Sequence, residues 1–263
     1  MKESLDKALI LKGLEGTIFS RNFIFYESIS STNTLAKEQA INGAPEGTVV
    51  LAEEQTAGKG RLARRWLSPG QENLLFTILL RPLLNADNIF SLTMILAIST
   101  IDTVNELTGL DVLIKWPNDL YINKKKLAGI LTEFSLKNGI AEYVILGLGL
   151  NVNWMPGEGD GIPYPATSVL AESGVAVSRN SLLISILKRF EETYKKALSG
   201  NTEYLHMRWN ELSMVIGRDV EIISLDDVIK GKAMAIDREG ALILKNSKGE
   251  EIRILSGDVS LRF

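Results

Sequence analysis

A long apolar segment in the first half of the chain sets the strongest limit on the fold. Residues 89 to 104 form the most apolar long stretch, and it is interrupted by polar residues that include Ser91, Thr93, Ser99, Thr100 and Asp102. A membrane-spanning helix needs roughly 20 consecutive apolar residues, so this segment is too short to cross a bilayer. It is predicted to lie within a helix, over residues 87 to 107, in the core of a globular protein.

The hydrophobic periodicity elsewhere predicts a mixture of helices and strands. Strands are expected over residues 23–29, 48–53, 73–80, 112–116, 119–122, 127–134 and 142–153. Helices are expected over residues 1–13, 34–42, 180–198 and about 202–212, with the polar run Ser30-Ser31-Thr32-Asn33 as a cap for the second. Because most connections between strands are short, the fold class is α+β, with a mainly antiparallel sheet flanked by helices.

From Gly217 onward the sequence pattern changes to short predicted strands joined by turns. Short strands are expected over residues 220–224, 232–236, 242–245, 251–255 and 259–262. Turn pairs separate them: Asp226-Asp227, Glu239-Gly240, Lys248-Gly249 and Ser256-Gly257. This pattern is typical of a small β-barrel, so we expect two domains, residues 1–213 and 214–263.

Composition excludes several functions. The 263 residues hold 29 Lys and Arg against 32 Asp and Glu, a formal net charge of −3, which is the wrong sign for a dedicated nucleic-acid binder. The absence of cysteine excludes disulfides, thiolate nucleophiles and cysteine-ligated metals, and the single histidine, His206, is interpreted as a packing or surface residue. No metal site is predicted. The start of the chain lacks a secretory signal, so a cytoplasmic protein is expected.

The segment Gly58-Lys59-Gly60-Arg61-Leu62-Ala63-Arg64-Arg65-Trp66 carries four positive charges in nine residues. A solvated basic loop is one interpretation. The two glycines favour a second one, in which the backbone approaches an anion that the arginine forks also bind. The dinucleotide-binding pattern also fits formally, but no helix follows the glycines, so we reject it.

Three further segments carry candidate residues: Lys115-Trp116-Pro117-Asn118-Asp119, Lys126-Leu127-Ala128-Gly129-Ile130-Leu131, and Gly147-Leu148-Gly149-Leu150-Asn151-Val152-Asn153. Each also has a purely structural interpretation: a tight turn, a solvated lysine and a β-bulge, respectively. Glycine within a strand otherwise marks a close backbone approach, and Gly129 is expected to leave room for a ligand.

Taken together and in this order, these segments, with Ser31-Thr32-Asn33, Gln55 to Ala57 and Ser68-Pro69, resemble the biotin protein ligases. The resemblance implies a catalytic domain like that of class II aminoacyl-tRNA synthetases, followed by an SH3-like domain. It also implies a two-step reaction. The biotin carboxylate attacks the α-phosphate of MgATP to give biotinyl-5′-AMP, and a lysine of a biotin carboxyl carrier domain then attacks the mixed anhydride.

The resemblance also assigns roles to residues. Those implied to bind biotin are Ser31, Thr32, Asn33, Gln55, Gly58, Lys59, Gly60, Arg61, Lys126 and Gly129. Those implied to bind ATP are Arg61, Arg64, Trp66, Lys115, Asn118, Lys126 and Asn151, with Trp66 near the adenine. Lys126, Arg61 and Lys59 are the implied catalytic residues, and Mg²⁺ accompanies ATP. The sequence departs from the family pattern at two positions, with Lys59 in place of arginine and Ala63 in place of glycine.

Other functions stay open on the sequence alone. Lipoate or octanoate ligases share the implied fold and chemistry, and the basic loop with the Trp-Pro-Asn-Asp turn is the feature that favours biotin. A biotin-responsive transcriptional repressor is the rival from another class. Because only about 20 residues precede the first expected strand and a three-helix DNA-binding module needs on the order of 50, we expect a monofunctional ligase. No DNA or membrane partner is expected, and homodimerisation is left open.

Overall fold

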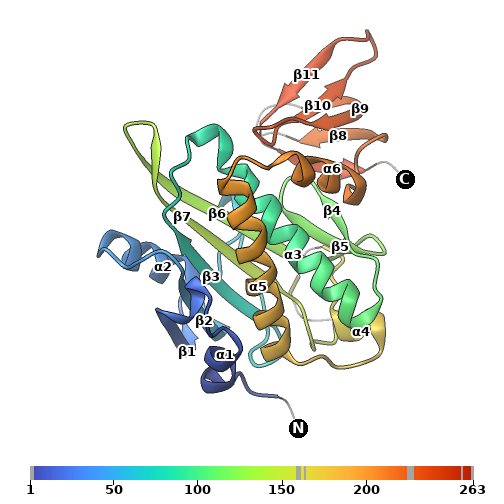
Figure 1. The fold of residues 1–263 in the computed structure, drawn as a ribbon. Helices are drawn as coiled ribbons and strands as arrows, with labels where there is room; N and C mark the ends of the chain where they lie inside the picture. Colours follow the sequence, from blue (N-terminus) through green and yellow to red (C-terminus); the bar gives the residue numbers. More distant parts are fainter. Residues whose placement is uncertain (1–2, 158–160, 163, 224–227, 256, 262–263) are drawn as a thin grey trace.

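Two β-sheets organise the chain. The computed structural model describes residues 3–157, 161–162, 164–223, 228–255 and 257–261 (Figure 1). The larger sheet has the order β1-β2-β3-β7-β6-β5-β4. Its strands are β1 (Phe23–Ile29), β2 (Thr48–Gln55), β3 (Leu74–Leu80), β4 (Leu113–Lys115), β5 (Asp119–Ile122), β6 (Lys125–Lys137) and β7 (Ile140–Leu150). Only the β1–β2 pairing in this sheet is parallel, which confirms the mainly antiparallel prediction.

The second sheet is antiparallel and lies at the C-terminal end (Figure 1). Its order is β11-β10-β9-β8-β12. The strands are β8 (Asp219–Ile223), β9 (Val228–Ile236), β10 (Leu242–Lys245), β11 (Glu251–Ile254) and β12 (Asp258–Leu261). The five expected strands are therefore present. The proposed division between residues 213 and 214 stays a prediction.

Helices cover both faces of the larger sheet. The long helices α3 (Phe90–Thr108) and α5 (Arg179–Leu198) lie side by side across one face (Figure 1). Helix α2 (Thr32–Ile41) packs on the other, because the residues it buries, Val50, Leu79 and Ile145, alternate along the strands with those beneath α3. The remaining helices are α1 (Lys7–Gly13), α4 (Val169–Ser173), α6 (Glu203–Leu212) and three short 3-10 turns: η1 (Ile18–Ser20), η2 (Arg61–Ala63) and η3 (Ala86–Asn88).

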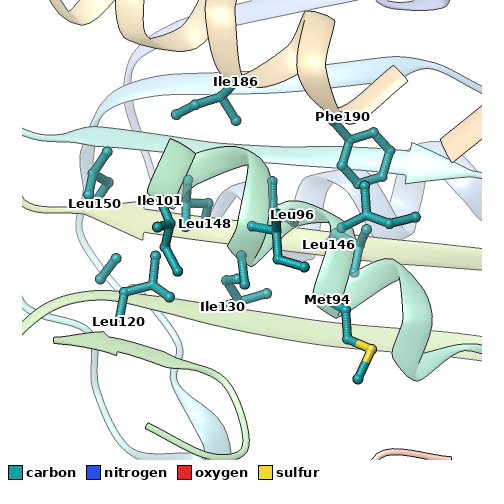
Figure 2. Packing of buried hydrophobic residues seen from close by; sticks show 14 of the residues in the cluster. Met94, Leu96, Ile101, Leu120, Ile130, Leu146, Leu148, Leu150, Ile186 and Phe190 are labelled. Atoms are coloured by element: carbon teal, nitrogen blue, oxygen red, sulfur yellow. The ribbon is translucent and has the colours of Figure 1, made fainter. Parts of the chain in front are cut away.

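The core lies between α3, α5 and the larger sheet. Figure 2 shows Leu96 and Ile101 of α3 facing Leu146 and Leu148 of β7, with Phe190 of α5 beside them. The polar residues of α3 do not prevent burial. The Thr100 and Thr103 hydroxyls donate to the carbonyls of Leu96 and Ser99, four residues earlier, at 2.7 and 2.8 Å. The helical segment Ala86–Thr108 is long and apolar enough to span a membrane, but 78% of its apolar window is buried inside the protein, which confirms the predicted core helix.

Some expected boundaries are wrong. Helix α2 begins two residues before the expected start, and Ser31 occupies its N-cap position without a side-chain capping bond. Helix α1 starts only after Asp6, whose carboxylate caps it, and the five-residue helix α4 was not predicted. Strand β6 extends to Lys137 and β9 starts at Val228, since pairing with neighbouring strands continues past the apolar runs. The expected turns at Asp226-Asp227 and Ser256, and parts of the loop over 154–165, lie outside the described residues.

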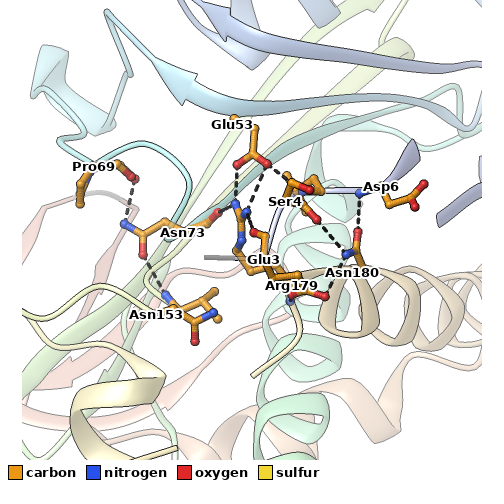
Figure 3. A network of polar contacts seen from close by, with 12 residues as sticks. Glu3, Ser4, Asp6, Glu53, Pro69, Asn73, Asn153, Arg179 and Asn180 are labelled. Atoms are coloured by element: carbon orange, nitrogen blue, oxygen red, sulfur yellow. Dashed lines mark hydrogen bonds and ion pairs between the residues drawn. The ribbon is translucent and has the colours of Figure 1, made fainter. Parts of the chain in front are cut away.

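A buried ion pair joins the start of α5 to the larger sheet (Figure 3). The Arg179 guanidinium, at the start of α5, lies 2.5 Å from the Glu53 carboxylate of β2, and both side chains are almost fully buried. Arg179 also donates to the carbonyls of Asn73 and Glu3, while the Glu3 carboxylate accepts from the Arg179 backbone amide. These contacts bring the N-terminal segment, the end of β2 and the start of α5 into one network.

Removing one partner of this pair is expected to destabilise the fold strongly, because the other charge is left buried. Arg179→Met should lower the free energy of unfolding by about 3–5 kcal/mol, measured by urea denaturation. Lys196→Ala is the control, since it breaks only an exposed pair with Glu192, and exposed pairs contribute little to stability. Equal losses in the two variants would show that the buried pair is not what holds this end of the sheet.

Candidate active site

One cavity collects most of the predicted site residues. Its volume is about 240 Å³, and residues of the larger sheet, the basic loop, the turn before β5 and one residue of the second sheet, Val259, line it. The predicted residues on its wall are Ser31, Thr32, Asn33, Gln55, Lys59, Gly60, Arg61, Arg64, Trp66, Lys115, Asn118, Lys126 and Gly129. Two predicted residues are not on it: Gly58 lines an adjoining groove, and Asn151 is buried.

One end of the cavity presents hydrogen-bonding groups held by the protein. The backbone amide and hydroxyl of Thr32 both donate to Gln55 Oε1, at 2.7 and 3.0 Å. These bonds fix the orientation of the Gln55 amide, so its Nε2 group is the end left to donate to a ligand. The Ser31 hydroxyl makes no capping bond to α2 and is likewise left to the cavity. The expected capping role of this cluster is therefore not used.

Asn33 is mainly committed to the protein. Its Nδ2 donates to the Glu133 carboxylate at 2.9 Å and to the Leu131 carbonyl at 3.3 Å. Its Oδ1 accepts from the fully buried Thr77 hydroxyl at 2.7 Å. An asparagine side chain has two donor hydrogens and one acceptor oxygen, so Asn33 keeps little capacity for a ligand. Thr77 was missed by the sequence analysis, because a threonine inside an apolar strand gives no signal besides packing.

The basic loop folds into a narrow hairpin over the cavity. Lys59 and Arg65 form an antiparallel bridge, and the Trp66 amide donates to the Gly58 carbonyl at 2.9 Å. A Cβ on Gly58 would lie 2.7 Å from the Trp66 carbonyl oxygen. This glycine therefore serves the close approach of the two arms of the hairpin, and its expected approach to biotin stays a prediction. The positive φ of the loop falls at Leu62, at 54°.

Trp66 lies on a platform of two glycines. Gly129 of β6 and Gly149 of β7 are paired opposite each other. A Cβ on Gly149 would lie 2.5 Å from the Trp66 ring, and one on Gly129 would lie 3.2 Å from it. Gly129 also lines the cavity, so the expected approach of a ligand to it stays a prediction. The Trp66 Nε1 group is buried without a protein acceptor among the described residues, so it is a donor within the site.

Lys126 is held at the centre of the cavity. Its Nζ lies 2.8 Å from the Asp119 carboxylate, and 5.5 and 5.3 Å from the ring centroids of Trp66 and Tyr164. A cation between two aromatic faces and a carboxylate is fixed in place while its remaining N–H donors stay usable. Burial and the Asp119 carboxylate raise the pKa of the Tyr164 hydroxyl, so this group stays neutral at pH 7. Neither Asp119 nor Tyr164 was predicted as a site residue, although Asp119 belongs to a quoted motif.

Other predicted residues have structural contacts. Arg61 donates to Asn118 Oδ1 at 3.2 Å, which ties the loop to the turn before β5. The Lys115 ammonium lies 5.1 Å from the Tyr121 ring centroid. Asn151 donates to the Thr167 carbonyl at 2.9 Å, so its nucleotide-binding role stays a prediction. His206 is half-buried in α6, where burial and Arg238 lower its pKa.

Comparisons with known proteins identify the family. The Biotin/lipoate A/B protein ligase family matches residues 25–151, and the Biotin protein ligase C terminal domain matches residues 215–262. The bifunctional ligase/repressor BirA of Bacillus subtilis is 34% identical over 258 residues, covering 98% of this chain and 79% of the relative. This chain belongs to the biotin protein ligase family. The biotin–[acetyl-CoA-carboxylase] ligase of Mycobacterium tuberculosis is also similar, 33% identical over 87% of this chain and 85% of the relative.

Solved structures agree with the fold of this ligase. The biotin protein ligase from Aquifex aeolicus in complex with biotin and ATP has a TM-score of 0.77 and 30% identity, and the match covers 92% of this chain and 99% of that structure. The expected class of catalytic domain with a C-terminal β-domain is therefore confirmed.

The charge of the ligase cavity is opposite to that of the whole chain. Among the described residues of its wall, six cationic side chains (Lys59, Arg61, Arg64, Arg65, Lys115 and Lys126) accompany one carboxylate, Asp119. The chain as a whole carries a formal charge of −3. Such a concentration of positive charge stabilises anions, and phosphoryl groups in particular.

Gly149→Ala should displace Trp66, because the added methyl group would overlap the indole. A shift of about 1 Å in an active-site group can lower the rate on the order of 100-fold, so we expect a loss of that size in adenylate formation. The measurement is pyrophosphate release with saturating substrates.

Gly70→Ala is the matched control, since a Cβ there meets only Glu54 at ordinary contact distance. Unchanged pyrophosphate release by Gly149→Ala would show that the glycine platform does not position Trp66 for the reaction.

Proposed function

We propose that this ligase joins biotin to a specific lysine of a biotin carboxyl carrier domain through biotinyl-5′-AMP. The observation that carries the proposal is a single cavity with amide and hydroxyl groups at one end and clustered cations along its wall. The ureido ring of biotin needs neutral donors and acceptors, whereas its carboxylate and the ATP phosphates need cations. The similar protein from Mycobacterium tuberculosis is named a biotin–[acetyl-CoA-carboxylase] ligase, and the similar structure from Aquifex aeolicus holds biotin and ATP. Both support the proposal.

The first step joins two anions, and the site supplies the opposing charge. A carboxylate oxygen of biotin attacks the α-phosphorus of ATP, the P–O bond to the β-phosphate breaks, and pyrophosphate leaves. Lys126 and Arg61 would offset the repulsion between the two anions and the charge that develops on the phosphoryl oxygens. Asp119 keeps the Lys126 ammonium at one place, so little reorganisation is needed during the reaction.

In the second step the amine of the acceptor lysine attacks the carbonyl carbon of the mixed anhydride. The C–O bond to phosphate breaks, AMP leaves with the bonding electron pair, and the amine loses a proton to give a neutral amide. No residue of the ligase is covalently modified, which is compatible with a chain without cysteine.

The acceptor could reach the cavity along β6. Strand β5 pairs only with residues 125 to 129 of β6, and Asn118 bonds to both backbone groups of Ile130. Among the described strands, the part of β6 from Leu131 onward therefore pairs with β7 alone. Leu131, on this part, lines both the cavity and the adjoining groove. An unpaired strand edge accepts an added strand, and one placed here would lie beside the adenylate. We therefore assign this edge to the carrier domain.

Magnesium would enter the site as part of the ATP substrate. Among the described residues no group of three or more His, Cys, Asp or Glu gathers. The one carboxylate on the described cavity wall, Asp119, is paired with Lys126. Mg²⁺ commonly binds through substrate phosphates and water with few protein ligands, so the ion would be held chiefly by ATP.

The deciding experiment identifies the adenylate. The pure protein is incubated with MgATP and equimolar biotin, lipoate and octanoate, and the small molecules are analysed by mass spectrometry. Biotinyl-AMP is the expected product. Lipoyl-AMP or octanoyl-AMP as the main product, or no adenylate at all, would overturn the proposal.

Lys126→Ala is expected to lower biotinyl-AMP formation by at least about 100-fold, because it removes the central cation from the cavity. Lys125→Ala is the matched control, since the neighbouring lysine is half-exposed and pairs with Glu172 outside the cavity. Thermal melting should show that both variants fold. Near wild-type turnover by Lys126→Ala would show that its charge does not drive the first step.

A further inference from the structure

The turn that carries two site residues is held by the second sheet. Trp116 lies in the turn between β4 and β5 and is only 2% exposed. Its indole Nε1 donates to the Gly240 carbonyl at 2.8 Å, across 124 residues of sequence. Gly240 belongs to the turn between β9 and β10, at the side of the C-terminal sheet that faces the rest of the molecule.

Gly240 is fitted closely to the catalytic part of the molecule. Its φ is +86°, and a Cβ there would lie 2.2 Å from the Phe90 ring at the start of α3. The turn itself is well braced, because Asp237 Oδ1 accepts from the backbone amides of Glu239 and Ala241, each at 2.9 Å. The Gly240 carbonyl is therefore presented to Trp116 from a rigid support.

The residues that follow Trp116 hold the charged groups of the cavity. Asn118 accepts from Arg61 of the basic loop and donates from Nδ2 to the Ile130 carbonyl of β6 at 2.5 Å. Asp119 pairs with Lys126. A shift of the turn would move both contacts, whereas the Thr32–Gln55 cluster belongs to α2 and β2 and does not involve it.

We propose that Trp116 is a positioning residue, through which the Gly240 turn of the C-terminal sheet fixes Asn118 and Asp119 for the ATP side of the reaction. This inference rests on the proposed function. It assigns the second sheet a part in the chemistry, which is also supported by the place of Val259 on the cavity wall. Gly240 itself does not line the described cavity, so its part in the reaction is indirect.

The first test removes the indole N–H. Trp116→Phe keeps an aromatic ring but leaves the Gly240 carbonyl without its donor. Losing a buried hydrogen bond is expected to lower kcat/KM for ATP on the order of 10-fold, with the KM for biotin unchanged. Trp209→Phe is the matched control, because Trp209 is fully buried against Phe90 and its Nε1 has no hydrogen-bond partner among the described residues.

The second test changes Gly240, whose carbonyl accepts the Trp116 hydrogen bond. Gly240→Ala should push the turn away from Phe90 and reproduce the kinetic change of Trp116→Phe. Gly249→Ala is its control, since Gly249 has the same backbone strain, with φ at +84°, in another hairpin turn of this sheet where a Cβ meets only Lys245 at 3.9 Å. Comparing Gly240→Ala with Gly249→Ala therefore distinguishes the effect of backbone strain at a glycine from the effect of losing the contact with Phe90.

The outcomes are distinct. A higher KM for ATP in Trp116→Phe and Gly240→Ala, but not in their controls, supports the inference, because loss of folded protein would lower kcat without changing KM. Wild-type kinetics in both variants, or the same change in variants and controls, overturns it. Wild-type protein that makes no biotinyl-AMP would instead overturn the proposed function.

Discussion

The pairing of β6 with β7 is the constraint on which the site depends. Its register sets Gly129 opposite Gly149 and Leu131 opposite Gly147. The first pair leaves room for the Trp66 indole to pack directly on the sheet. Gly147 allows Asn33 to approach the sheet, since a Cβ there would lie 2.0 Å from Asn33 Oδ1. A slip of one residue would place side chains where these groups lie. The central strands therefore position both ends of the cavity before any ligand contributes.

The cationic side chains of the cavity are held in position by neutral and aromatic groups as well as by an acid. Lys126 has one carboxylate and two rings around it, and Arg61 is held by the amide of Asn118. Pairing every cation with an acid would cancel the field that a phosphate needs. Aromatic faces and amide oxygens orient the cations without a neutralising negative charge, so most of the positive field remains available to a phosphate. This explains how an acidic protein can maintain a strongly positive cavity.

Local pattern was enough to predict most elements, whereas the candidate site residues were assigned through the resemblance to a family. The strands, the core helix and the basic loop all follow from periodicity and composition, and most residues assigned by the family resemblance meet at one cavity. The missed features depend on contacts between distant segments. Thr77 reads as an ordinary core residue, Tyr164 lies in a proline-rich loop, and the Gly240 contact joins two sheets. The packing of Trp66 on the two glycines could not be predicted either, because a glycine in a strand shows only that space exists and not which group fills it.

The Arg179–Glu53 pair also governs when the chain can complete its fold during synthesis. Its partners are 126 residues apart, and Arg179 further contacts Glu3 at a separation of 176. A ribosome delivers the sheet and its buried carboxylate long before the start of α5 emerges. Until then Glu53 lacks its counter-charge, so the nascent sheet stays incomplete at that end. This network of the catalytic part can therefore form only after residue 179, about two thirds of the way along the polypeptide, has been made.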